Sequence, residues 1–132
     1  MTSTSNLQAP CPCGSAQTYD ACCGRLHRGA DQAATPEELM RSRYAAYAVG
    51  GSVGDAYVFR TWHPRTRPAD VTTDPGLEWT GLEILRAEDD VVEFAAHYTY
   101  GGVARVLHET SRFAQRAGRW VYVEPISSST GS

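Results

Sequence analysis

The sequence contains no lysine, and all twelve of its basic residues are arginines. Fifteen acidic residues outnumber them, which leaves a formal net charge of −3. A nucleic-acid-binding domain is expected to carry a clear basic excess. Arg65 and Arg67, on either side of Thr66, form only a small basic spot. We therefore expect no direct binding to nucleic acid.

Long apolar runs are missing as well. No stretch approaches the roughly 18 apolar residues of a membrane-spanning helix. Residues 1–9 lack the positive-then-apolar pattern of a signal peptide. We expect a cytoplasmic protein without a membrane partner. Residues 1–10 and 127–132 are rich in serine or threonine and poor in apolar side chains, so we predict disordered tails there.

Cysteine is absent except for one cluster, Cys11, Cys13, Cys22 and Cys23. In a reducing compartment, such clustering indicates metal binding rather than disulfides. Adjacent cysteines have Cα atoms only about 3.8 Å apart, which is short for a relaxed disulfide. Two thiolates on each of two tight turns can converge on one ion, and the corner at residues 14–15 lets the chain reverse between them. We predict a four-thiolate metal site, with a redox thiol motif and disulfide pairing as the alternatives.

From Thr35 onward the sequence is typical of an amphipathic domain. Thr35, Pro36 and Glu38 predict the start of a helix, because they supply an N-cap, a proline at the first position and a capping-box acid. The glycine pair at residues 50–51 ends this helix, and a second helix is expected to follow as far as Trp62. Period-two alternation then predicts four strands. They cover residues 77–86, 91–100, 103–113 and 119–124.

This order indicates an α+β fold, in which helices pack on one face of a curved antiparallel sheet. The glycine pair at residues 101–102 predicts a two-residue hairpin turn. If Tyr100 lies opposite Val103, Phe94 lies opposite Glu109, and both face the helices. A slip of one residue would exchange the two faces of the sheet.

Glu109 then becomes a carboxylate on the inner face. Burial requires it to be protonated, hydrogen-bonded or paired with an arginine. Arg41 and Arg43 on the first helix are the nearest candidates by topology. A structural ion pair is one interpretation, and a general base with a raised pKa is the other. His97 and His108 belong to the outer face.

Several large aromatic residues are candidates for the lining of a cavity between the helices and the sheet. Such a lining is mostly apolar, as small-molecule sites generally are. The same side chains also fill ordinary cores, so that interpretation stays open. The expected lining residues are Tyr44, Trp62, His63, Trp79, Phe94, Tyr98 and Glu109.

The segment CPCGSAQTYDACCG resembles the SEC-C motif, a metal-binding hairpin found at the C-terminus of the SecA translocation ATPase. Many such motifs end in Cys-His, whereas this one ends in Cys22-Cys23. Six further segments, LMRSRYAAY, TWHP, LEWTGLEIL, VEFAAHY, HETSRF and GRWVY, extend the resemblance to the YchJ family of bacterial proteins. This resemblance implies a SEC-C motif over residues 11–30. It also implies a cone over residues 35–126, similar to cystatin and nuclear transport factor 2, in which helices pack on a curved sheet.

Two hypotheses of different class follow. The first is a metal-binding interaction or adaptor protein whose hairpin holds zinc, with iron as the alternative, and docks a protein partner. The resemblance to the SecA motif implies a partner in the export or chaperone machinery or the ribosome. The docking residues expected to be exposed are Tyr19, Arg25, His27 and Arg28.

The second hypothesis is a small-molecule-binding protein or an enzyme of the isomerase or dehydratase type that uses the cavity. Only Glu109 is placed for acid–base work, so this hypothesis ranks behind the first. A third interpretation, a thiol-based sensor, conflicts with a closed four-thiolate set, which is typical of a structural site. The outer sheet face, with His97, His108 and Thr110, is compatible with a homodimer.

Overall fold

The computed structural model describes residues 8–131 in three helices followed by four strands. The expected tail at residues 1–7 and Ser132 lie outside the described residues. Within residues 8–131, no helix is long and apolar enough to cross a membrane. The elements are α2 (Cys23–His27), α3 (Pro36–Val49), α4 (Gly51–Arg60), β1 (Leu77–Glu88), β2 (Val91–Tyr100), β3 (Val103–Arg116) and β4 (Arg119–Gly131).

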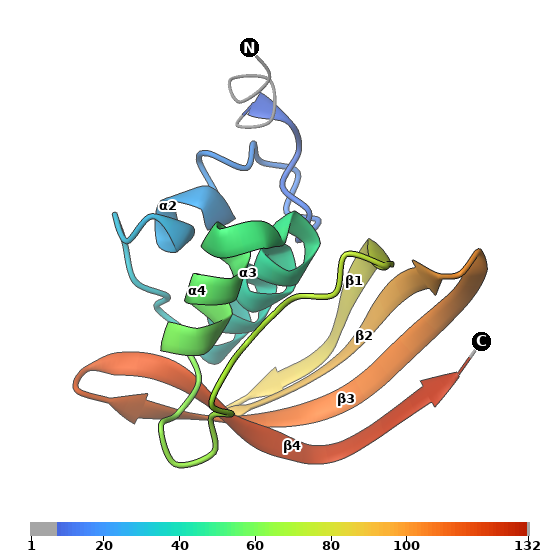
Figure 1. Cartoon of the computed structure of the whole chain (residues 1–132). Helices are drawn as coiled ribbons and strands as arrows, with labels where there is room; N and C mark the ends of the chain where they lie inside the picture. The colour runs from blue at the N-terminus through green and yellow to red at the C-terminus, as the bar shows by residue number, and fades with distance from the viewer. Residues whose placement is uncertain (1–7, 132) are drawn as a thin grey trace.

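The strands form one antiparallel sheet in the order β1-β2-β3-β4. The sheet curves around α3 and α4, while α2 and the cysteine segment lie on the side of these helices away from the sheet (Figure 1). Register shifts in β1, between Trp79 and Gly81 and between Ile84 and Arg86, add to this curvature because a bulge bends its strand. The predicted α+β architecture is confirmed.

Helix α3 begins as the sequence predicts. Thr35 Oγ1 accepts a hydrogen bond from Glu38 N at 3.1 Å, and Pro36 occupies the first turn. Gly50, with φ of 67°, ends α3 and leads directly into α4. The two helices then approach so closely that a Cβ atom on Gly54 would lie 2.2 Å from the carbonyl oxygen of Ala46. This close approach fixes α4 against α3, the helix that packs on β1, β2 and β4.

The predicted hairpin register is confirmed. Gly101 and Gly102 have φ of 59° and 79°, as a type I′ turn requires. Phe94 pairs with Glu109, and Val92 and Phe94 are buried beneath the helices. The inner face of the sheet is therefore the face that the sequence assigns.

Residues 127–131 correct the prediction of a disordered tail, because they form the end of β4. They pair with residues 106–110 of β3. Their side chains are exposed, so this extension shows no alternation of apolar and polar residues. Its order comes from backbone pairing with β3, which a scan for apolar residues does not detect.

One apolar core joins α2, α3, α4 and the sheet. Leu26 of α2 belongs to the same cluster as Leu39 of α3, Val58 of α4 and Phe113 of β3. These four side chains are 2% exposed or less. The cysteine segment is therefore seated on the larger domain through a shared core.

Candidate metal centre and cavity

The four cysteine thiols converge on one point. Their sulfur atoms all lie within 4.8 Å of one another, and all four cysteines are free of disulfides. The Sγ atoms of Cys13 and Cys22 are 3.6 Å apart, and those of Cys22 and Cys23 are 3.9 Å apart. Four sulfurs at about 2.3 Å from a tetrahedral ion lie about 3.8 Å from one another. The thiols are therefore placed to hold a metal ion.

The local chain geometry explains this convergence. Gly14 has φ of 84°, which turns the chain back after the first cysteine pair. The amides of Cys22 and Gly24 both donate to the carbonyl oxygen of Tyr19, at 3.1 and 2.8 Å. A Cβ atom at position 24 would lie 2.7 Å from that oxygen, so glycine is required there. Glycine at both turns keeps the two cysteine pairs facing each other.

Hydrogen bonds among the thiols shift the pKa values of Cys11 and Cys13 in opposite directions. Hydrogen bonds from the Cys11 and Cys23 thiols to Cys13 lower the pKa of Cys13. The same interaction with Cys13 raises the pKa of Cys11 to about 11. One thiolate is therefore stabilised among its neighbours. Binding of a divalent cation to all four sulfurs would release the remaining protons.

His27 holds the hairpin on α3. Its Nε2 atom lies 2.9 Å from the carbonyl oxygen of Ser42, which can only accept, so Nε2 carries the proton. Nδ1 therefore accepts from the hydroxyl of Tyr19 at 2.6 Å. The residue is 5% exposed, and burial lowers the pKa of His27, which keeps the ring neutral.

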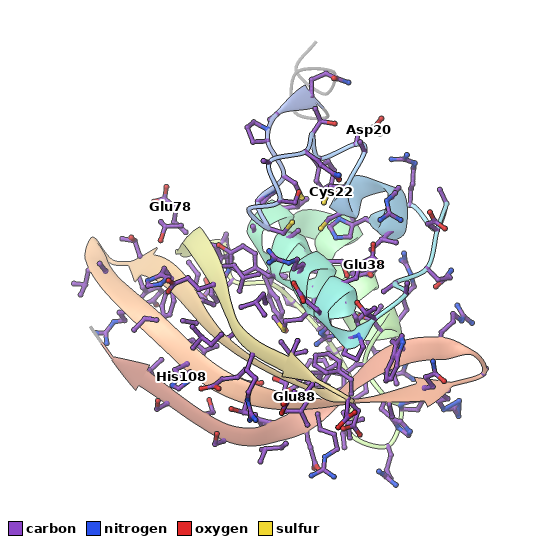
Figure 2. All side chains as sticks on the ribbon, turned by 180° about the vertical axis from the view of Figure 1, so that it is seen from behind. Asp20, Cys22, Glu38, Glu78, Glu88 and His108 are labelled. Carbon is purple, nitrogen blue, oxygen red and sulfur yellow. The ribbon has the colours of Figure 1, made fainter. Side chains whose placement is uncertain are left out.

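Two arginines reinforce this attachment. Arg41 Nη1 on α3 donates to the carbonyl oxygen of Cys13 at 2.8 Å. Arg60 Nη2 on α4 donates to the carbonyl oxygens of Leu26 and His27, at 3.2 and 2.7 Å. Figure 2 shows the labelled Cys22 on the side of α3 away from the sheet. Hairpin and helices are thus joined by directional bonds as well as by Leu26.

A cavity of about 270 Å³ lies between α3 and the inner face of the sheet. Five of the seven expected lining residues contribute to it: Tyr44, Trp62, Trp79, Phe94 and Glu109. Tyr98 does not line it, and packs against Trp79 with ring centres 5.1 Å apart. His63 does not line it either, and its Nδ1 accepts a hydrogen bond from Arg65 N.

Within residues 8–131, Glu109 has no arginine at ion-pair distance. Its Oε2 atom accepts hydrogen bonds from Ser111 Oγ at 2.6 Å and from the hydroxyl of Tyr122 at 3.1 Å. The expected ion pair with Arg41 or Arg43 is wrong. Arg41 pairs with Glu37 instead, with 3.1 Å between Nε and Oε2. Two hydroxyl donors, which the sequence analysis missed, satisfy the carboxylate.

Arg43 lines the same cavity and is 3% exposed. Its Nη1 atom donates to the carbonyl oxygen of Val58 at 3.0 Å and to Thr61 Oγ1 at 2.8 Å. Its guanidinium carbon lies 4.5 Å from the ring centre of Tyr122 and 5.0 Å from that of Trp62. A buried cation on two aromatic faces is therefore a main polar feature of the cavity.

Two family models match the chain. Residues 35–125 match the model described as the YchJ middle NTF2-like domain, and residues 9–25 match the SEC-C motif. The chain belongs to the YchJ family. The UPF0225 protein of Streptomyces coelicolor is 49% identical over 122 residues, which cover 87% of this chain and 93% of that protein. The UPF0225 protein of Deinococcus radiodurans is 52% identical over 116 residues and covers 87% of both chains.

A solved structure shares the fold of this YchJ-family chain. It is the crystal structure of a SEC-C motif-containing protein from Psychrobacter arcticus, with a TM-score of 0.73 and 23% identity. The match covers 96% of this chain and 87% of that one. It therefore includes both the cysteine segment and the curved sheet, and supports the arrangement of Figure 1.

The docking surface expected in this YchJ-family chain needs one correction. His27 is buried, so the expectation that it is exposed is wrong. Tyr19 is half-buried, and its hydroxyl is bound to His27. Arg25 pairs with Asp31 and Glu38, whereas Arg28 is exposed and pairs with half-buried Asp20. The sequence contains no local signal for the burial of His27, which results from docking of the hairpin on α3.

The outer face of the sheet carries two separate histidine–carboxylate pairs. His97 Nε2 lies 3.0 Å from Glu83 Oε1, and His108 Nε2 lies 2.7 Å from Glu93 Oε2. Each histidine is thus paired with a different carboxylate. Across residues 8–131, the cysteines form the one group of ligand side chains close enough together to share an ion.

Proposed function

We propose that this YchJ-family chain is a zinc-binding interaction protein of the cytoplasm, whose metal hairpin docks a protein partner. The convergence of four free thiols at spacings that suit a tetrahedral ion supports the proposal. A closed set of four sulfurs leaves no coordination position for a substrate, so the ion has a structural role. The thiol ligands remain reduced in the cytoplasm.

The docking surface that we propose is the exposed rim of the hairpin. Residues 14–17 form its tip and are all exposed, and Arg28 projects from the end of α2. Ala16 adopts φ of 73°, a left-handed conformation that is costly for alanine. The metal would hold this tip in one conformation, which reduces the entropy lost when a partner binds. By analogy with the SecA motif, we propose a partner from the export or chaperone machinery or the ribosome.

Native mass spectrometry with metal analysis tests the zinc assignment. Wild-type protein is expected to carry one zinc per chain, and Cys22→Ser is expected to lose it. Ser52→Ala, an exposed position on α4, is the matched control and should retain the ion. One iron per chain would reject zinc while keeping the four-thiolate site. A metal-free protein with disulfides would reject the site itself.

Site-specific photo-crosslinking tests the docking surface. A photoreactive residue at position 17, on the exposed tip, is expected to give a protein adduct in cells, and this adduct should disappear in the Cys22→Ser background. The control position is Glu88, which is exposed at the end of β1. Adducts of equal yield at both positions, or adducts at position 17 that survive loss of the metal, would reject docking through the hairpin.

A further inference from the structure

Arg43 is a buried cation with unused hydrogen-bonding capacity. Both of its hydrogen bonds are made by Nη1, and its Nε and Nη2 atoms make none to residues 8–131. None of the described carboxylates lies within ion-pair distance of it. A buried charge is costly unless it is paired, and guanidinium stays protonated in proteins. Glu109 acts on this cation electrostatically from across the cavity without bonding to it, so the side chain retains donors for an anionic group.

A second donor lies beside it. Trp62 Nε1 is the one side-chain nitrogen or oxygen in residues 8–131 that is both closed to solvent and without a hydrogen-bond partner. The indole ring of Trp62 is one of the two rings on which Arg43 stacks, and both residues line the cavity. An indole N–H can only donate. Arg43, which stacks on this ring and has free donors, therefore favours a ligand group rich in acceptor oxygens.

Glu109 does not cancel this preference. Its Oε2 atom already accepts from Ser111 and Tyr122, which disperses its charge. Tyr122 presents its ring face to Arg43 and its hydroxyl to Glu109, so the cation and the carboxylate lie at different parts of the same phenol. An anion bound at Arg43 need not contact Glu109.

The rest of the lining is apolar. Tyr44 and Trp79 pack edge to face with ring centres 5.7 Å apart, and Phe94 and Leu107 extend this surface along the sheet. Aromatic surfaces of this kind favour a flat ring in offset or edge-to-face contact. A volume of about 270 Å³ is small for a ligand pocket, which restricts the ligand to a single ring with a short substituent.

We propose that the cavity between α3 and the sheet binds a small aromatic carboxylate, with the carboxylate on Arg43 and the ring against Tyr44, Trp79 and Phe94. This site lies on the sheet side of α3, whereas the thiol cluster packs against Ala45 of that helix. It is thus separate from the metal centre, and its existence does not depend on the docking proposal.

Isothermal titration of the metal-loaded full chain with phenylacetate tests the site. Phenylacetamide serves as the neutral probe of nearly the same shape, and phenethylammonium as the cationic probe. A ligand of this size is expected to bind with about millimolar affinity. Phenylacetate should bind at least about tenfold more tightly than phenylacetamide, because a hydrogen bond to a charged partner is stronger than one between neutral groups.

Three variants locate the binding. Arg43→Met should abolish the preference for the carboxylate. Arg43 also bonds to Val58 and Thr61, so its replacement can disturb the fold as well as the site. Two further variants therefore test the cavity itself. Ala96→Leu fills the cavity without changing a charge, and Ala95→Leu adds the same side chain to the opposite face of β2. Phenylacetate binding should be lost in Ala96→Leu and retained in Ala95→Leu.

The Glu109→Gln variant distinguishes binding of an anionic ligand from binding of a cationic one. Removal of this carboxylate should leave phenylacetate binding unchanged or tighter. Tighter binding of phenethylammonium that is lost in Glu109→Gln would overturn the proposal in favour of a cation site. Equal binding of phenylacetamide, binding that survives Ala96→Leu, or no binding of phenylacetate at millimolar concentration would each overturn it as well.

Discussion

At the scale of single residues, His27 shows how a polar side chain becomes structural. Both ring nitrogens are used, one by the carbonyl of Ser42 and one by the hydroxyl of Tyr19. The ring also packs against that of Tyr57, with centres 4.6 Å apart. Protonation of Nδ1 would reverse the hydrogen bond with Tyr19 and place a positive charge on a buried ring, so these contacts favour the neutral imidazole. The attachment of the hairpin is therefore sensitive to acid.

Stability is expected to fall in mild acid because of His27. Burial lowers the pKa of His27 in the folded protein, whereas the unfolded chain binds a proton with a pKa of about 6.5. Between these two pKa values the unfolded state binds more protons, so stability decreases as the pH falls below about 6.5. Urea unfolding of wild type and His27→Gln across this range measures the difference.

The His27→Gln variant should be less stable at neutral pH by about 1–3 kcal/mol and should lose stability less steeply in acid. His63→Gln is the control, since the half-exposed ring of His63 accepts a hydrogen bond from the backbone amide of Arg65 and holds no other element in place. Parallel pH profiles for wild type and His27→Gln would show that His27 does not link protonation to folding.

At the scale of elements, Gly54 sets how closely α3 and α4 cross. An alanine usually stabilises a helix relative to glycine by about 1 kcal/mol. Here its Cβ would lie 2.2 Å from the carbonyl oxygen of Ala46, so the helices must separate. We expect Gly54→Ala to destabilise the protein by about 1–3 kcal/mol instead.

Ser52→Ala, exposed on the same helix, should change stability by less than about 0.5 kcal/mol. Thermal unfolding measures both, and a more stable Gly54→Ala protein would contradict the close crossing.

The end of β4 gives a second prediction at this scale. Removal of residues 127–131 should cost little stability, since their side chains are exposed. It should however release those amides within residues 106–110 that bond to β4, because successive amides of a central antiparallel strand alternate between its two neighbours. Hydrogen exchange is expected to become faster in that segment and to stay unchanged in residues 91–95 of β2. Unchanged exchange in residues 106–110 would mean that the pairing does not persist in solution.

These elements also show what the sequence could and could not predict. The register of β2 and β3 was predictable because a glycine turn and period-two alternation both act locally. The end of β4 was not, because its order comes from a neighbouring strand. The same limit applies to the cavity. Its apolar lining was predictable from the pattern of each strand. The hydrogen-bond partners of Glu109 were not, because they depend on side-chain distances between β3, β4 and α3. Tyr122 and Ser111 satisfy that carboxylate, and Arg43 is left facing the cavity.

At the scale of the whole molecule, the hairpin and the larger domain form one structure. Leu26 lies in the main core, and Arg41 and Arg60 bind backbone carbonyls of the hairpin. A structural zinc site can contribute on the order of 10 kcal/mol to folding. Metal bound by the thiols should therefore stabilise the sheet and helices as well as residues 11–30.

Metal removal is accordingly expected to lower the melting temperature of the entire chain in a single transition. By linkage, the reverse must also hold: a substitution that weakens the shared core should weaken metal binding. Leu26→Ala touches no thiol, yet it should cost about 2–5 kcal/mol in stability and speed the release of zinc to a chelator. Leu85→Ala, at a leucine that is 51% exposed on β1, is the matched control and should change neither quantity.

Two separate melting transitions, or zinc release from Leu26→Ala at the wild-type rate, would show instead that the hairpin and the domain fold independently. The single-transition outcome would mean that the metal reports on the packing of the whole molecule, because the ion and the sheet then depend on the same buried leucine.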